Sequence, residues 1–424
     1  MKSVTIDRDK RLRDEPHTGH NRWHPDVPPI VEVAPGEEVV LETRDASDGQ
    51  IKPNTTEADF DSFDTKVSHP LTGPVYVQGA KPGDLLEIEY VNVEPQSRAW
   101  TRVRPGSGFL RDIYTEPYLA HWNIADGWAT SPQIPGVRIP NGSFMGTAGL
   151  APSHDQLREW TRREADLVDR GGTAAPPDPE DAVPSEGPVA NDGARTIPPR
   201  ENCGNADAKQ LTTGSKLFVP VAVKGALYSA GDGHFAQGDS ECCITAIEMG
   251  ATVTVRFKVH EGEAAAKNIR FPRFAHPGYF LPPEWAAPRN FIATMGFPIR
   301  DDGTNESEDV ALAARHALLN MIRLLQERGY SAVQAYVICS VAVDLKISNI
   351  VDLPNVTVSA FLPEGIFVWR KSHGNSEHTD DCPARGSDCR WRSNCVDALP
   401  SIGPPKSDRA IYRFGEVARK GEYA

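Results

Sequence analysis

Proline and glycine recur along the whole chain and leave little room for long helices. Thirty-six prolines and 35 glycines are spread over 424 residues. Proline breaks a helix interior and glycine weakens it, so the pattern favours many short strands joined by turns. Segments 38–43, 75–78 and 85–93 are strand-like, with a tight Pro-Gly-Asp turn at 82–84. We therefore expect residues 1–150 to form a β-sandwich resembling a jelly roll.

Two later segments are predicted to be helices. Ser153 precedes Gln156 in a capping-box pattern. A longer helix begins near Ser307, has apolar residues at helical spacing and ends at Gly329. The apolar run 333–342 that follows predicts a buried strand. The fold class is therefore mainly β with an α+β part near the C-terminus.

The remaining segments complete the predicted organisation. Residues 151–200 contain the first helix and an insertion rich in proline, glycine and acids. Residues 201–370 form a β-rich and α+β region with a small β-barrel-like middle, and residues 371–424 form an extension. The insertion, from 171 to 199, has too few apolar residues for a core of its own. We expect it to be exposed, so that deleting 171–191 costs little stability, or else to act as a lid or an oligomer contact.

Charge and hydropathy limit the partners. The formal net charge of −13 argues against nucleic acid and anionic membranes. No apolar run approaches 18 residues and no signal peptide is recognisable, so we expect a soluble, cytoplasmic protein.

The seven cysteines, an odd number, argue against a complete disulfide framework. Cys242 and Cys243 are expected to be buried in a strand, and Cys339 in the run 333–342. The C-terminal tail could hold a structural zinc, although it lacks a CxxC pair; its candidate ligands are Cys382, Cys389, Cys395, His373 and His378.

Residues 201–248 contain an unusual density of acids, together with a histidine, set among glycines. Asp232 and His234 are two residues apart, so in an extended strand both side chains point to the same face. A carboxylate and an imidazole aimed at one point are typical ligands of a zinc-like ion. A Gly-Asp-Gly turn with one histidine is commonly only a hairpin. The additional acids, Asp207, Asp239 and Glu241, favour a functional site.

The same region resembles the signature of the acetamidase/formamidase family of amide hydrolases. The motif NxGNxDxK at 202–209 is followed by GDGHxxQGDxE at 231–241. GHNRWHPDVPPI from 19, PGEEVVLETRDASDGQI from 35, HPLTGPVYVQGAKPGDLLEIE from 69 and VAVDLKISNIVDLPNVTVSAFLP from 341 are also similar to this family, the last to its formamidase branch. The resemblance extends to about residue 369.

The resemblance implies hydrolysis of a small linear amide such as formamide or acetamide to ammonia and the carboxylate. This chemistry suits a metal-activated water, with Asp207, Asp232 and His234 as ligands and zinc, or alternatively calcium, as the ion. Glu241, or alternatively Asp239, is the predicted general base. Substrate-binding candidates are Asn205, Gln237, His20 and Gln50. We expect a homo-oligomer, either a dimer, a trimer or a hexamer.

Departures from the family pattern leave two other functions open. Cys203 stands where glycine or histidine is expected, Ser240 replaces a frequent glycine, and the insertion from 171 is longer than expected. Cys203 could act as the nucleophile of a thiol amidase, with His234 or Glu241 as base. Alternatively, the chain is a metal- or sugar-binding β-sandwich without catalysis.

Overall fold

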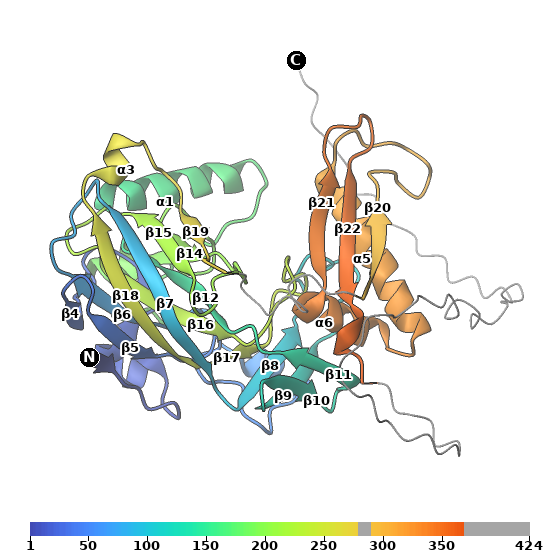
Figure 1. The fold of residues 1–424 in the computed structure, drawn as a ribbon, viewed down its shortest axis with the longest axis horizontal. Helices are drawn as coiled ribbons and strands as arrows, with labels where there is room; N and C mark the ends of the chain where they lie inside the picture. The colour runs from blue at the N-terminus through green and yellow to red at the C-terminus, as the bar shows by residue number, and fades with distance from the viewer. Residues whose placement is uncertain (279–289, 369–424) are drawn as a thin grey trace, which may run out of the picture. The chain divides into compact units, whose positions relative to one another are not determined.

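The computed structural model describes residues 1–278 and 290–368, and two β-sheets form most of it (Figure 1). The first sheet is antiparallel except at one edge, where its first two strands run parallel. Its six strands follow the order β1 (Lys2–Val4), β5 (Glu38–Glu42), β18 (Ala251–His260), β7 (Leu85–Pro95), β15 (Lys216–Pro220) and β19 (Arg273–Ala275).

The second sheet has eleven strands. Its main path follows the order β11 (Ile134–Pro140), β10 (Trp128–Ser131), β9 (Tyr118–Ala125), β8 (Arg98–Val103), β17 (Glu248–Met249), β16 (Tyr228–His234), β12 (Phe144–Leu150) and β14 (Cys203–Asn205). A branch starts at β16, which pairs with β6 (Leu71–Val77), and β6 in turn pairs with β2 (Gly19–His20) and β4 (Val31–Val33). A separate pair joins β3 (Arg22–Trp23) to β13 (Ala194–Arg195).

The two large sheets enclose one apolar core. Alternate residues of β18, such as Val253 and Val255, are fully buried, as strand periodicity requires. The rings of Tyr228 on β16 and Phe257 on β18 meet edge to face at 5.3 Å and join the two layers. The prediction of a mainly β fold is confirmed. In the described ranges no sheet closes on itself, so the small barrel predicted for the middle region is wrong.

Strands from distant parts of the sequence alternate within both sheets. In the first sheet β7 lies between β18 and β15, as Figure 1 shows. In the second, β16 lies between β12 and β17. The sandwich is therefore built jointly by residues from 1–150 and from 201–278. The predicted strands at 38–43, 75–78 and 85–93 are confirmed as β5, the end of β6, and β7.

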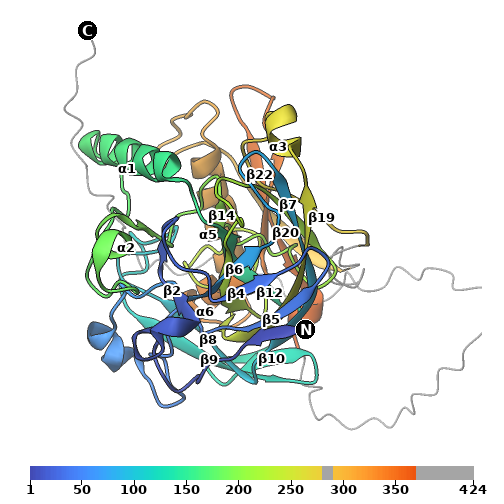
Figure 2. The ribbon, with the colours of Figure 1, turned by 90° about the vertical axis from the view of Figure 1, so that its left-hand side faces the viewer.

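Two helices cover the β3–β13 pair, and Figure 2 shows them on the same side of the β-structure. The first, α1 (His154–Asp169), begins at Ser153, whose hydroxyl accepts from the Gln156 N–H, so the predicted capping box is confirmed. Leu157 and Trp160 of α1 are buried against residues of β3, β6 and β13. The second, α2 (Gly187–Asp192), lies in the insertion. A further short helix is α3 (Glu263–Ala266).

The α+β part near the C-terminus contains two helices and a three-stranded sheet. Helix α5 (Val310–Glu327) packs against the sheet, whose strands follow the order β20 (Phe291–Gly296), β22 (Thr357–Pro363), β21 (Asp344–Asn349). The predicted helix is confirmed, and its N-cap is Asp309, two residues after Ser307.

The strand predicted over 333–342 is wrong, because these residues form α6 (Ala332–Ala342). Ser331 and Gln334 form a capping box at its start, which the sequence analysis overlooked. This helix is buried on nearly all sides, so its sequence shows no helical period that would separate it from a buried strand. Cys339 is buried, as predicted. Cys242 and Cys243 are buried too, but in a turn rather than a strand.

The insertion is packed against the sandwich, so the expectation that it is exposed is wrong for its second half. Val183, Val189 and Ala190 are 5%, 6% and 1% exposed. The fully buried Arg22 guanidinium donates to the carbonyl oxygens of Asp178 and Glu180. It also donates to the carbonyls of Asn21 and Lys66. The insertion is therefore held in place by hydrogen bonds to the Arg22 guanidinium of β3, and not by an apolar core of its own.

Replacing Arg22 by methionine should therefore destabilise the protein by about 3–5 kcal/mol, because several buried carbonyls lose a charged donor at once. We expect residues near Asp178 to become sensitive to limited proteolysis before the rest of the chain. Urea unfolding and proteolysis with mass spectrometry measure both effects. Arg158→Met, on an exposed face of α1, is the matched control. Unchanged proteolysis near Asp178 in Arg22→Met would show that the cation does not hold the insertion.

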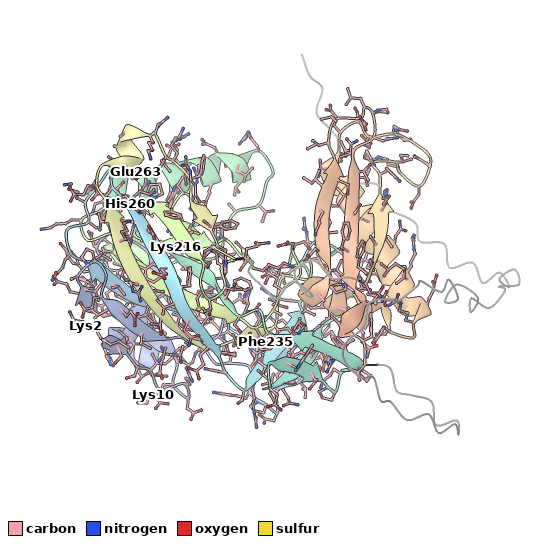
Figure 3. All side chains as sticks on the ribbon, in the orientation of Figure 1. Lys2, Lys10, Lys216, Phe235, His260 and Glu263 are labelled. Atoms are coloured by element: carbon pink, nitrogen blue, oxygen red, sulfur yellow. The ribbon has the colours of Figure 1, made fainter. Side chains whose placement is uncertain are left out.

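Two remaining observations concern surfaces and the tail. None of the described helices is both long and apolar enough to cross a membrane. On the first sheet, His260 and Lys216 lie on strands either side of β7 and both pair with Glu87 (Figure 3). The predicted zinc ligands of the C-terminal tail, Cys382, Cys389, Cys395, His373 and His378, lie outside the described residues.

Candidate active site

Strand β16 brings Asp232 and His234 together in the interior. Their side chains are 2% and 1% exposed, and Asp232 Oδ1 lies 3.4 Å from His234 Nε2. The glycines between and before them allow this close packing. A Cβ on Gly231, for example, would lie 2.2 Å from the carbonyl oxygen of Pro70. The two side chains are close together as predicted, although the φ of 57° at Asp232 departs from the extended strand on which the prediction rested.

Glu248 joins them from the neighbouring strand β17. The strand register places it directly opposite His234, and its Oε2 lies 3.2 Å from His234 Nε2. The carboxylate is 2% exposed, and its other oxygen accepts the Ala246 N–H. Sequence reasoning missed this residue because the strand register cannot be read from the sequence. A single acid inside the apolar run 244–249 was the available signal.

Asp207 and Glu241 approach the imidazole of His234 from two loops. Asp207 Oδ1 lies 3.9 Å from His234 Nδ1, and ligand atoms of Asp207, His234 and Glu241 all lie within 4.8 Å of one another. Both acids have a positive φ, 46° and 47°, so their loops turn sharply at these positions. Gln237 braces the arrangement: its Oε1 lies 3.0 Å from His234 Nδ1, and its Nε2 donates to the carbonyl of Asp207 at 2.8 Å.

We call these five residues, Asp207, Asp232, His234, Glu241 and Glu248, the carboxylate–histidine cluster. Burial raises the pKa of Asp207 and Glu248, and neighbouring acids add to the effect. Burial also raises the pKa of Glu241 well above its usual range, with Asp207 as the next cause.

The pKa values of Asp232 and His234 shift in opposite directions. Burial alone would raise the pKa of Asp232, but the neighbouring His69 and His234 lower it below its usual range. Burial likewise opposes the charge on His234, yet Glu248 and Asp232 raise its pKa well above the ordinary value. Burial and mutual proximity therefore disfavour the ionised form of three of these carboxyl groups, and a cation bound among them would stabilise that form.

The donor atoms of the cluster fit a small divalent ion. Among the buried side-chain atoms of the described residues that have no hydrogen-bond partner, four belong to the cluster: Asp207 Oδ1, Asp232 Oδ1, His234 Nε2 and Glu248 Oε2. Ligands about 2.0–2.2 Å from one tetrahedral ion lie about 3.3–3.6 Å apart. The 3.2 and 3.4 Å separations around His234 Nε2 are close to this spacing. With Nδ1–H donated to Gln237, Nε2 keeps its lone pair for an ion.

Gly146 on β12 leaves the space that such an ion would need. A Cβ built on it would lie 2.7 Å from both Asp207 Oδ1 and His234 Cε1, and 2.9 Å from His234 Nε2. Because φ at Gly146 is not positive, glycine matters at this position for its lack of a side chain and not for an unusual backbone conformation. Nothing in the sequence around Gly146 indicates this role.

Gly146→Ala should therefore lower bound divalent metal and amide turnover together, while the melting temperature changes little. The added methyl group occupies the space between Asp207 and His234 rather than the apolar core. Metal analysis and ammonia release measure the effect. Gly278→Ala is the control, because its nearest neighbours lie at 3.8 Å and beyond. Normal metal content in Gly146→Ala would contradict the assignment of this space.

His69 and Asn205 reach the cluster through Asp232. His69 is partly buried, and its Nε2 lies 3.9 Å from Asp232 Oδ2. Burial lowers the pKa of His69. Thr147 Oγ1 lies 3.1 Å from the same oxygen and also contacts Asn205 Oδ1. The predicted Asn205 thus touches the site through Thr147, whereas His69 was not predicted as a site residue.

Three other predicted residues make contacts of a different kind. His20 Nε2 lies 2.8 Å from Ser229 Oγ, and burial lowers the pKa of His20 to about 4. Gln50 bonds the backbone of Ser47 and Asp64 within its own loop. Asp239 accepts from Gln210 and lies near Lys209. The structure therefore brings together five of the predicted residues, Asp207, Asp232, His234, Glu241 and Gln237. His20, Gln50 and Asp239 make their contacts elsewhere.

Cys203 is a poor candidate for a nucleophile. It is 4% exposed, and burial together with the Asp207 charge raises the pKa of its thiol to about 12. A reactive cysteine instead needs a lowered pKa and access to substrate. The geometry therefore disfavours the thiol amidase alternative.

Comparisons with known proteins agree with the geometry. Residues 5–369 match the Acetamidase/Formamidase family. An acetamidase of Mycolicibacterium smegmatis is 36% identical over 79% of this chain and 88% of its own, and a formamidase of Methylophilus methylotrophus is 35% identical over 86% and 93%. A solved gamma lactamase from Delftia acidovorans superposes with a TM-score of 0.82 at 34% identity, over 87% of this chain and 94% of its own. The chain belongs to the acetamidase/formamidase family.

Proposed function

We propose that this protein hydrolyses short linear amides of the formamide and acetamide type at the carboxylate–histidine cluster. Membership of the family makes the chain a hydrolase of linear amides, the class that the sequence predicted. The observation that carries the proposed site is the set of four unpartnered, buried ligand atoms, two of which, Asp207 Oδ1 and His234 Nε2, border the space at Gly146.

We assign Asp207, Asp232, His234 and Glu248 as the residues that would hold a divalent ion. Ligand atoms of Asp232, His234 and Glu248 lie within 4.8 Å of one another, and Asp207 is grouped in the same way with His234 and Glu241. A nitrogen with carboxylates suits zinc, whereas calcium prefers a larger shell of oxygen ligands. When bound, such an ion supplies Lewis acidity that polarises a carbonyl and acidifies water. Glu248 thus joins the three ligands predicted from the sequence.

The protein's own groups would orient the site and move the proton. Gln237 fixes the tautomer of His234 and the position of Asp207 through its two ends. Thr147 holds the carboxylate of Asp232 in position through a hydrogen bond. Glu241 lies beside Asp207, and burial raises its pKa, which makes its carboxylate a stronger base. Glu241 would take the proton of the attacking water and return it to the departing nitrogen. Ammonia and the carboxylate are the products.

Ammonia release from a panel of short amides, with metal analysis of the same sample, tests the proposal. We expect turnover of formamide or acetamide and bound zinc. The non-catalytic β-sandwich alternative predicts bound metal and no turnover of any amide. Turnover by metal-free protein would contradict the assigned site while leaving the reaction class intact.

A further inference from the structure

Strand β8 places an arginine on the sheet face that bears the carboxylate–histidine cluster. The strand ladder pairs His234 with Glu248 and Glu248 with Trp100, so these three side chains share a face. Arg102 follows Trp100 by two residues and therefore points to the same face. It is a diagonal neighbour of Glu248, at a spacing of about 7–8 Å that long side chains can bridge.

The guanidinium of Arg102 has no acceptor among the described residues. The side chain is partly buried, its guanidinium carbon lies 5.4 Å from the centroid of the Trp100 ring, and its Nε is buried without a hydrogen-bond partner. Arg11 and Arg195 also have one such nitrogen, but Arg11 pairs with carboxylates and Arg195 donates to a backbone carbonyl. Within the described ranges, Arg102 has neither kind of partner.

The charges around Arg102 favour a small anion. Burial and the exposed Arg104 lower the pKa of Arg102, whereas Glu248 and Asp45 raise it. A partly buried cation without hydrogen bonds is costly, and an anion that accepts from its N–H groups would remove that cost. Because two acids lie nearby, a singly charged anion would meet less repulsion there than a doubly charged one.

Building on the function proposed above, we propose that Arg102, supported by Trp100, binds the monocarboxylate anion that amide hydrolysis releases beside Glu248. The planar fork of a guanidinium matches the two oxygens of a carboxylate, and the Trp100 ring supports that fork. The amide substrate is neutral and the carboxylate is charged, so Arg102 binds the product in preference to the substrate. Accumulated carboxylate therefore inhibits the enzyme.

Formate binding, measured from its proton NMR line width at constant ionic strength, tests the anion site directly. Arg102→Met should weaken binding by about 10-fold or more, the factor expected for a hydrogen bond between charged groups. Arg102→Lys keeps the charge but loses the fork, so its affinity should lie between the two, and it serves if the methionine variant fails to fold. Arg138→Met is the matched control, because the exposed Arg138 lies 4.0 Å from the Trp128 ring centroid. Equal formate affinity in all these proteins would overturn the site.

Inhibition of formamide turnover by formate tests the link to the reaction. The inhibition constant should rise in Arg102→Met by the same factor as the dissociation constant, and it should not change in Arg138→Met. Formate that binds at Arg102 without inhibiting turnover would overturn the product role. Because binding is measured without turnover, the two proposals fail separately: absence of ammonia release from every amide by the unmodified protein would overturn the proposed function, whereas the anion site is decided by the binding data.

Discussion

His234→Ala is expected to lose both bound divalent metal and amide turnover. The imidazole lies between Asp232, Glu248 and Asp207, so its removal takes away the one nitrogen donor and leaves acids facing one another. Removing residues that merely support metal ligands costs about 10- to 100-fold, so losing a ligand should cost more than about 100-fold in kcat/KM. Metal content and ammonia release from formamide measure the two losses.

The matched control is His260→Ala, which removes an imidazole from the surface of the first sheet (Figure 3). That variant should keep metal and turnover. Circular dichroism should show both variants folded. Full metal occupancy in the Asp232→Ala, His234→Ala double variant would rule out this assignment.

Glu241→Gln should keep the metal but lower kcat by about 10²- to 10⁴-fold, the usual range for general acid–base catalysis. The amide preserves shape and hydrogen bonding but cannot accept a proton. KM should change little. Because the pKa of Glu241 is raised, the unmodified enzyme should lose activity as pH falls through that pKa and the base becomes protonated. This acidic limb should be absent in Glu241→Gln.

Glu261→Gln, at an exposed position, controls for the change from carboxylate to amide. Loss of metal together with rate in Glu241→Gln would make Glu241 a ligand instead of the base. Near-normal kcat with metal retained would transfer the proton-transfer role to another residue.

Much of the fold was predictable from local patterns. Strand alternation and turns predicted β5 and β7, and a capping box predicted α1. The sequence of helix α6 resembles that of a strand because a segment buried on nearly all sides has no polar face to reveal its period. The packing of the insertion was missed because the stabilising group, Arg22, lies far away in the sequence and acts through backbone carbonyls.

The site residues, too, were predictable only where their relation is local in the sequence. Asp232 and His234 could be predicted because their relation is local to one strand. Glu248 and Gly146 depend on strand register and on space between strands, which only the folded chain defines. Oligomeric state and cytoplasmic location stay predictions.

Removing metal with a chelator and restoring it tests the central claim, that the carboxylate–histidine cluster holds an ion needed for amide hydrolysis. Ammonia release from formamide should disappear in the stripped protein and return in proportion to added zinc, reaching its maximum at one ion per chain. Stripped His234→Ala should regain neither metal nor activity. Full turnover by stripped, metal-free protein would contradict the claim.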